Sequence, residues 1–278
     1  MSPSLDLTPL SPFNYGSLST LLIYWQVPPP AVEGLVAANA VGLQPAVFGG
    51  RSLVCLNFER YSSLGANFAG ITVETEFNIV VRPADGAGIL PTLTVDQFLA
   101  GCDEAKVYGN FRVNVPCTDP VAVQHGSQDY GEIKFLTGYN YQVPGVNAPT
   151  VADWWIRCRD PKTPTSDTPF IFDLHANFQG TRPQVSNFSP VVAYANLKKP
   201  DGPHLVLSGR NVFGPFLRWT PGPDTVQLQI GTSDHPMVAQ MKTAFAGAEP
   251  VGILLFESQP AATSTHALVT TPVAVEGV

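Results

Sequence analysis

The stretch Ile71-Thr72-Val73-Glu74-Thr75-Glu76-Phe77-Asn78-Ile79-Val80-Val81 alternates between apolar and polar side chains. Successive side chains of an extended chain point to opposite faces. The apolar side chains of one face are Ile71, Val73, Phe77, Ile79 and Val81. The polar side chains of the other face are Thr72, Glu74, Glu76 and Asn78. The pattern predicts a β-strand whose polar face lies either in solvent or along the wall of a site.

The rest of the chain also consists mainly of apolar runs separated by turns rich in Pro and Gly. Further strands are predicted over residues 18–27, 52–58, 151–157, 169–178, 191–197, 204–208, 213–219, 226–230 and 251–257. Short helices are predicted over residues 31–40, 94–102, 120–127 and 236–245. Many strands with few short helices predict a β-rich α+β fold with a curved antiparallel, barrel-like sheet. Residues 1–17 predict an irregular arm before a single domain over residues 18–278.

The composition excludes several classes of protein. Only 13% of residues are charged and 44% are hydrophobic, against about 25% charged in ordinary domains. A surface poor in charge predicts a homo-oligomer that covers part of it. A net charge of −7 argues against a nucleic-acid partner, because such binding depends on Lys and Arg. The chain shows neither a secretion signal nor an apolar run that could span a membrane, so we expect a cytoplasmic protein without a membrane partner.

The cysteines and motifs give no sign of a metal or an organic cofactor. The four cysteines form no C-x-x-C pair and accompany no histidine cluster, which argues against zinc. We expect them to be free, buried thiols rather than disulfides. The motifs of serine hydrolases, zinc proteases, P-loop proteins and dinucleotide-binding folds are all missing from the sequence.

Among the six lysines, Lys134 alone is embedded in apolar sequence, between Ile133 and Phe135-Leu136. Burial disfavours an ammonium ion and lowers its pKa. A neutral amine attacks carbonyl groups and forms Schiff bases. The alternative is a lysine whose stem packs while its charged end reaches solvent.

Carboxylates lie where they could serve such a lysine as proton carriers. Glu74 and Glu76 share the polar face of the opening stretch, and Glu59 ends the preceding predicted strand. Glu132 precedes Lys134 by two residues and shares its face if the segment is extended. The alternative is an ordinary solvated strand face.

These residues resemble the acetoacetate decarboxylase family. The segment 126–136 resembles the one that carries the Schiff-base lysine of that family, which falls on Lys134. Phe58-Glu59 and Gly70-x-x-x-Glu74 match the spacing of two glutamates that line the family's active site. The similarity covers about residues 18–260 and includes a closing strand, helix and strand over residues 226–256. It implies a curved, barrel-like β structure with flanking helices and a lysine that forms a Schiff base without a cofactor.

The departures from the family pattern narrow what the resemblance implies. A second lysine that follows the nucleophile in acetoacetate decarboxylase is replaced by Phe135. The arginine that the family places before its first strand corresponds to about Ser17, and Arg51, Arg60 or Arg182 are the candidates to replace it. Other members of the superfamily keep the lysine and perform aldol or dehydration chemistry, and the sequence resembles such a divergent member.

We therefore predict a carbon–carbon lyase that acts on a keto acid or ketone by decarboxylation or by aldol or dehydratase chemistry. Lys134, Glu74 and Glu59 are the predicted catalytic residues. Glu132, Phe135 and Tyr130 are the predicted substrate-binding residues. Two alternatives remain open: a non-catalytic protein that binds an apolar carbonyl compound on the same fold, and a structural β protein.

Overall fold

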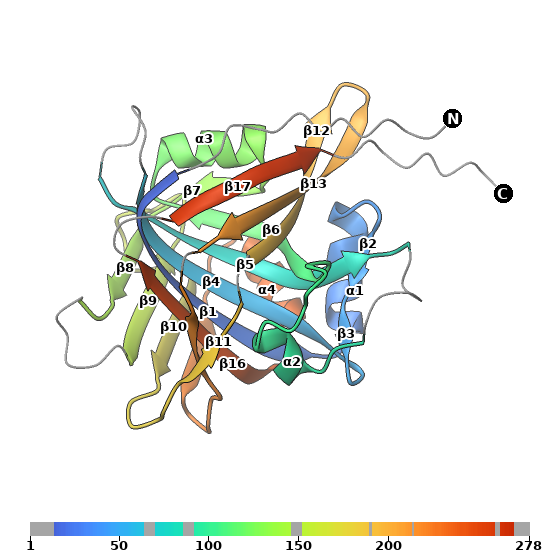
Figure 1. Ribbon diagram of the computed structural model, residues 1–278. Coiled ribbons are helices and arrows are strands. Elements are labelled where there is room, and N and C mark those ends of the chain that lie inside the picture. The colour runs from blue at the N-terminus through green and yellow to red at the C-terminus, as the bar shows by residue number, and fades with distance from the viewer. Residues whose placement is uncertain are drawn as a thin grey trace.

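A computed structural model describes residues 14–63, 70–85, 92–145, 152–188, 191–212 and 214–258, and the backbone of residues 262–269. Its main feature is a large, strongly curved sheet, with a smaller sheet beside it (Figure 1). The strands of the large sheet are β1 (Asn14–Val27), β2 (Leu43–Pro45), β3 (Val47–Phe48), β4 (Arg51–Ser63), β5 (Thr72–Pro83), β6 (Gly109–Cys117), β7 (Lys134–Leu136), β11 (Gln184–Ser186), β12 (Val191–Lys199), β13 (Gly202–Asn211), β14 (Phe216–Trp219), β16 (Glu249–Ser258) and β17 (Ala262–Val269).

The large sheet follows the order β11-β14-β16-β1-β17-β13-β12-β6-β5-β4-β3, and β1 also pairs along its length with β4. Most neighbours are antiparallel, but β6 runs parallel to both β12 and β7. The predicted β-rich, curved and barrel-like architecture is therefore confirmed. The sheet is mixed rather than wholly antiparallel, because helix α3 (Pro120–Asp129) connects β6 to β7 and brings the chain back in the same direction.

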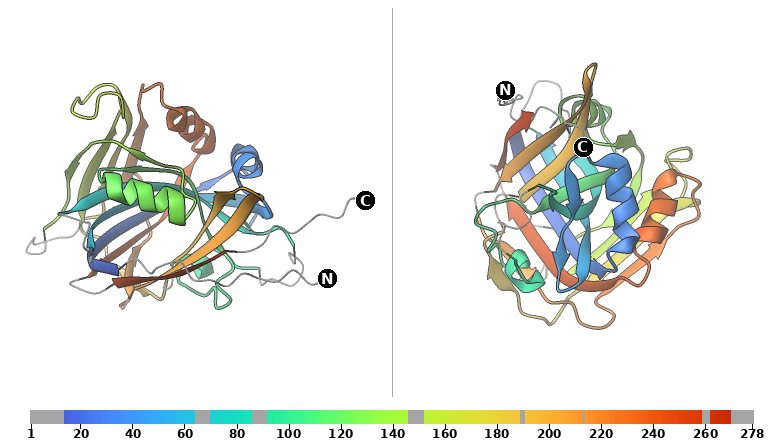
Figure 2. Two further views of the ribbon diagram at one scale, coloured as in Figure 1. Left: turned by 90° about the horizontal axis from the view of Figure 1, so that it is seen from above. Right: turned by 90° about the vertical axis from the view of Figure 1, so that its right-hand side faces the viewer.

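The smaller sheet has the order β15-β10-β9-β8. Its strands are β8 (Tyr139–Gln142), β9 (Asp153–Arg159), β10 (Phe170–Asn177) and β15 (Val226–Ile230). The other helices are α1 (Pro30–Asn39), α2 (Val95–Leu99) and α4 (Pro236–Ala244). Helix α3 contacts β6, β7 and β12 of the large sheet (Figure 2). One apolar core joins residues of the large sheet, the small sheet, α1 and α4, and includes Phe77, Trp154 and Met241.

The predicted elements are largely confirmed, but strands β2, β3, β6, β7, β8, β11 and β17 were not predicted. The sequence did not indicate β6, which is buried throughout. Residues 14–17 lie in β1, so the predicted arm over residues 1–17 is wrong for this part, and residues 1–13 lie outside the described residues. The four cysteines are free as predicted, but Cys102 is exposed rather than buried. None of the described helices combines the length and the hydrophobicity needed to cross a membrane.

The burial of strand β5 shows whether its polar face lies in solvent or along the wall of a site. Every residue from Thr72 to Val81 is buried, so the polar face does not lie in solvent. Ile71, by contrast, precedes the strand and is 58% exposed, so its assignment to the apolar face was wrong. The carboxylates and amides of β5 therefore line the inner face of the curved sheet.

Candidate active site

Three local features place Lys134 on the inner face of the sheet. The Asp119 carboxylate caps α3 by accepting from the backbone N–H groups of Val121 and Ala122. After the helix, Gly131 adopts φ +68°, and a Cβ there would lie 2.5 Å from the backbone of Asn196. Only glycine allows this left-handed turn at such close approach. The chain then enters β7, where Lys134 pairs with Val115 of β6.

Gly126 of α3 leaves room for the lysine side chain. A Cβ at this position would lie 2.4 Å from Glu132 Oε2 and 2.6 Å from Lys134 Cδ. Real Cβ atoms do not approach other atoms so closely. The glycine that marks the resemblance to acetoacetate decarboxylases therefore has a steric reason in this chain.

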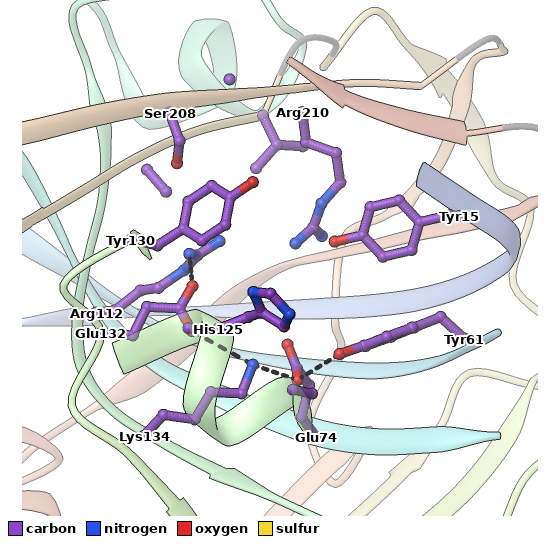
Figure 3. A pocket seen from close by; sticks show the side chains of 15 residues that line it. Tyr15, Tyr61, Glu74, Arg112, His125, Tyr130, Glu132, Lys134, Ser208 and Arg210 are labelled. Atoms are coloured by element: carbon purple, nitrogen blue, oxygen red, sulfur yellow. Dashed lines mark hydrogen bonds and ion pairs between the residues drawn. The ribbon is translucent and has the colours of Figure 1, made fainter. Parts of the chain in front are cut away.

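The Lys134 amine lies between two carboxylates (Figure 3). Lys134 Nζ is 2.6 Å from Glu74 Oε2 and 3.3 Å from Glu132 Oε2. The hydroxyl of Tyr61 donates to the same Glu74 oxygen at 2.9 Å. All three charged side chains are at most 7% exposed, so they interact with little screening by solvent.

Two arginines extend the network of charges across the inner face. Arg112 of β6 bridges Glu132 and Glu76, with a distance of 2.7 Å between Nη2 and Glu76 Oε1. Arg210 of β13 pairs with Glu59 and lies 3.6 Å from Glu76. The side-chain amides of Asn57 and Asn78 also donate to Glu76, at 2.9 and 3.2 Å. The result is a continuous chain of alternating charges from Lys134 to Arg210.

The charge state of Lys134 differs from the sequence-based expectation. Burial lowers the pKa of Lys134, but attraction to Glu132 and Glu74 outweighs it and raises the pKa well above its ordinary value. The expected neutral amine is therefore wrong for the resting state, in which Lys134 is an ammonium ion. The apolar neighbours in sequence do not bury it either, since Ile133 and Leu136 are 45% and 51% exposed.

The other buried carboxylates divide into two kinds. Burial, together with repulsion from Glu76 and Glu74, raises the pKa of Glu59 to about 7 although Arg210 opposes the shift. Burial also disfavours ionised Glu76, but Arg112, Arg210 and two amide donors outweigh it and lower its pKa to about 2. Arg112 and Lys134 likewise lower the pKa of Glu132 against the effect of burial. With Glu59 protonated, the charges of Glu74, Glu76 and Glu132 balance those of the three cations.

A small cavity of about 60 Å³ opens in front of Lys134. Lys134, Glu74, Glu132 and Tyr130 lie in its wall, so four of the predicted site residues come together. Glu59 lies behind Arg210, fully buried, and is not part of the wall. Phe135 does not face the cavity. Alternation along β7 turns its ring away from Lys134 and onto His235, with 4.2 Å between ring centroids, so its placement at the substrate site was wrong.

Sequence reasoning missed other residues of the wall: Tyr15, Tyr61, Arg112, His125 and Arg210. Arg112 lies in the alternating segment Asn110-Phe111-Arg112-Val113-Asn114, whose polar members could have indicated β6 as a second strand with a polar inner face. No signal in the sequence identifies Arg210. The three arginines considered as replacements for the family arginine do not line this cavity.

Three carboxylates of the site have the spacing of a metal site. Oxygens of Glu59, Glu74 and Glu76 lie within 4.8 Å of one another. However, Lys134, Arg112 and Arg210 already pair with these carboxylates. A cation would have to compete with three fixed positive charges, so the donor set fits an internal ion network better than a metal.

Comparison with known proteins gives matches in structure but not in sequence. No protein-family model and no curated protein matches the chain. The enduracididine biosynthesis enzyme MppR complexed with pyruvate is similar in structure, with a TM-score of 0.62, 13% identity and coverage of 98% of this chain and 94% of that one. MppR complexed with the condensation product of pyruvate and imidazole 4-carboxaldehyde gives a TM-score of 0.60, 11% identity and 99% coverage of both chains.

Acetoacetate decarboxylase from Legionella pneumophila subsp. pneumophila str. Philadelphia 1 is also similar, with a TM-score of 0.59 and 14% identity. The match covers 97% of this chain and 91% of that one. Matches over nearly the whole length at such low identity establish the fold, and they confirm at that level the resemblance indicated by the spacing of Glu59, Glu74 and Lys134. The chain has the acetoacetate decarboxylase-like fold, as a divergent representative of it.

Proposed function

We propose that this protein is an enzyme that forms a Schiff base between Lys134 and a small 2-oxo acid. The observation that carries the proposal is the position of Lys134 Nζ in a cavity wall, 2.6 Å from Glu74. An amine and a carboxylate at this distance can exchange a proton directly. Transfer from the ammonium to Glu74 neutralises both groups, which becomes more favourable when a bound substrate excludes the remaining water.

The size and charge of the cavity indicate the substrate class. A volume of about 60 Å³ holds roughly four to six water-sized groups, which suits a three-carbon 2-oxo acid. Arg210 faces the cavity from the side opposite Lys134 (Figure 3). The pKa of Glu59 is raised to about 7, so near neutral pH part of Glu59 is protonated, and in that state the guanidinium of Arg210 is the best placed group to bind the substrate carboxylate.

The reaction can then be written with the residues of the site. Neutral Lys134 attacks the ketone carbon, and one proton passes from the amine nitrogen to the oxygen to give a carbinolamine. Glu74 returns the proton it holds to the same oxygen, and the C–O bond breaks as water leaves. The resulting iminium withdraws electrons from the neighbouring carbon. Glu74 removes a proton from that carbon to give an enamine, with Tyr61 orienting the carboxylate. The enamine is the nucleophile of aldol-type chemistry.

Aldol-type addition, with or without loss of water, is favoured over decarboxylation. One structure similar to this chain is MppR with a condensation product of pyruvate and an aldehyde. In addition, loss of CO₂ is hindered if the carboxylate is held by Arg210, because that interaction stabilises the charged starting material more than the neutral product.

The proposal is tested by reduction of the protein with borohydride in the presence of pyruvate. Intact mass should rise by one reduced pyruvate adduct, and peptide mapping should place the adduct on Lys134. Lys134→Ala should abolish it, whereas Lys242→Ala, an exposed lysine of α4, should not change it. An adduct that persists in Lys134→Ala would contradict the proposal.

A non-catalytic binding protein is the second candidate. The observation that favours it is the raised pKa of Lys134, which makes the resting amine a poor nucleophile. In that case pyruvate would bind through the cations of the site without forming any adduct. If calorimetry detects binding of pyruvate and borohydride reduction gives no adduct, the protein is a non-catalytic binding protein.

A further inference from the structure

Helix α3 contributes one ionisable side chain to the wall of the small cavity. Ala122, His125 and Gly126 of this helix line the cavity, because residues three and four positions apart share one face of a helix. Gly126 allows the helix to lie against Lys134, and Ala122 is also small. His125 is therefore the side chain of this face that can take part in chemistry, and Figure 3 shows its imidazole directed into the ring of side chains around the cavity.

The proposed reaction leaves a proton on a buried carboxylate. Glu74 takes a proton from the carbon next to the iminium, and its side chain is only 5% exposed. Tyr61 and Lys134 contact the same oxygen of this carboxylate. A proton held there either returns to the same carbon or crosses the cavity to reach solvent. Exchange of substrate hydrogen with solvent therefore needs a second group that carries the proton outward.

Apart from Lys134 and Glu74, the buried titratable side chains described in the wall are poor proton carriers near neutral pH. Burial raises the pKa of Glu132, but its ion pairs outweigh burial and lower the pKa, so this carboxylate stays ionised. Guanidinium groups do not lose their protons in proteins, which excludes both arginines. Phenols stay protonated near neutral pH, and burial raises the pKa of Tyr15 and Tyr61 further.

His125 has the position and the chemistry of such a carrier. Its side chain lines the cavity and is nevertheless 48% exposed, so it reaches both the site and solvent. Imidazole gains and loses a proton between about pH 5 and 8. Nδ1 of His125 lies 2.7 Å from Oδ2 of Asp129, one helical turn further along α3. The carboxylate accepts from the Nδ1–H group, so proton exchange takes place at Nε2.

We propose that His125 carries protons between Glu74 and solvent, with Asp129 fixing the tautomer of the imidazole. The proposal rests on the proposed Schiff-base function and adds the proton path of that site. Glu74 passes the proton taken from the substrate across the cavity to Nε2, which leaves Glu74 ionised and makes His125 an imidazolium ion. The imidazolium releases one proton to solvent and becomes neutral again. The same path in reverse brings a solvent proton to Glu74 and from there to the enamine carbon.

The experiment compares His125→Gln with His175→Gln. His175 of β10 is a matched control, since it pairs with Asp153 at 2.9 Å and is 44% exposed but does not line the cavity. Three readouts are measured for each protein. They are borohydride trapping of pyruvate, the rate at which pyruvate deuterated at its methyl group loses deuterium to H₂O, and the same rate with imidazole added to the buffer. The rate with imidazole but without protein is subtracted.

The expected result separates Schiff-base formation from exchange. His125→Gln keeps Lys134 and Glu74, so it should trap pyruvate as the unmodified protein does. It should lose deuterium more slowly by about tenfold or more, because Glu74 returns the same deuteron to the substrate. Added imidazole should restore most of this rate, which a purely structural role of His125 would not allow. His175→Gln should match the unmodified protein in all three readouts.

Two results overturn the proton path while the Schiff-base function stands. One is loss of deuterium from His125→Gln at the rate of the unmodified protein. The other is a slower rate that imidazole does not restore or that His175→Gln shares. A missing pyruvate adduct in the unmodified protein would overturn the Schiff-base function and the proton path together.

Discussion

Both faces of β5 are buried, one among apolar side chains and the other in a network of ion pairs and hydrogen bonds. Val73, Phe77 and Ile79 point into the apolar core shared by the two sheets. Glu74, Glu76 and Asn78 point into the network of charges around Lys134 and Arg210. Successive residues of one strand thus lie in two environments a few ångströms apart.

The two faces of β5 contribute differently to the stability of the fold. Apolar burial contributes about 25 cal/mol per Å². A buried ion network gains little, because the removal of each charge from water offsets most of the attraction. A strand that needed only stability would be apolar on both faces. The proposed function gives the charged face a role that stability does not, and paired substitutions on the two faces test this contrast.

The largest effect is expected for Glu74→Gln against Val73→Ala. Glu74→Gln removes the proposed proton carrier and should slow hydrogen–deuterium exchange at the pyruvate methyl group by about 10²–10⁴-fold. Val73→Ala should cost about 2 kcal/mol of unfolding free energy and leave exchange unchanged. Exchange is followed by NMR in D₂O and stability by urea unfolding. Equal exchange rates in Glu74→Gln and the unmodified protein would exclude Glu74 as the proton carrier.

The next pair is Phe77→Ala and Glu76→Gln. Phe77→Ala opens a cavity and should cost about 4 kcal/mol at every pH. Glu76→Gln leaves buried arginine charge uncompensated and should cost about 3 kcal/mol near pH 7. The pKa of Glu76 is lowered from 4.5 to about 2, so its contribution is present above pH 4.5 and is lost as pH falls through 2. Urea unfolding at pH 7 and at acidic pH should show this loss for Glu76 alone. A pH-independent cost would contradict an ionised Glu76.

Glu59→Gln tests the opposite dependence of stability on pH within the same network of charges. The pKa of Glu59 is raised from 4.5 to about 7, so its favourable contribution is complete below pH 4.5 and is lost as pH rises through 7. Glu59→Gln should match the unmodified protein at pH 4.5 and become more stable above pH 7, by at most about 3 kcal/mol. The measurement is urea unfolding across this pH range. Parallel stability curves for the two proteins would show that Glu59 is ionised throughout.

The smallest effects are expected for two helix glycines. Gly126→Ala places a methyl group against Glu132 and Lys134 and should lower exchange of the pyruvate methyl group, with a stability cost of about 1–3 kcal/mol. Gly34→Ala in α1 meets no atom within 4 Å and should add about 1 kcal/mol without changing exchange. Activity assays and thermal unfolding compare the two. If Gly126→Ala exchanges the pyruvate methyl group at the rate of the unmodified protein, a displaced Lys134 still supports the reaction.

The sequence by itself indicated most of the strand pattern and placed Lys134 and Glu74 together as candidate site residues. Alternation is a local property, so it identified β5 and the polar face that carries Glu74 and Glu76. Spacing along the chain selected Lys134, Glu74 and Glu59 through a resemblance that is confirmed for the fold, and of the three only Lys134 and Glu74 line the cavity. The cap at Asp119 also follows from local geometry, because its carboxylate accepts from backbone groups two and three residues further on.

Only the tertiary structure decided the environment of these residues. Arg210 reaches the site through pairing of β13 with β12, which has no local signal. Arg112 reaches it through β6, whose place next to β5 is decided only by the fold. The apolar neighbours of Lys134 suggested a neutral amine, whereas the folded chain surrounds it with Glu74 and Glu132 and keeps it charged. The pKa of a buried group depends on all charges within a few ångströms, and those charges come from strands far apart in the sequence.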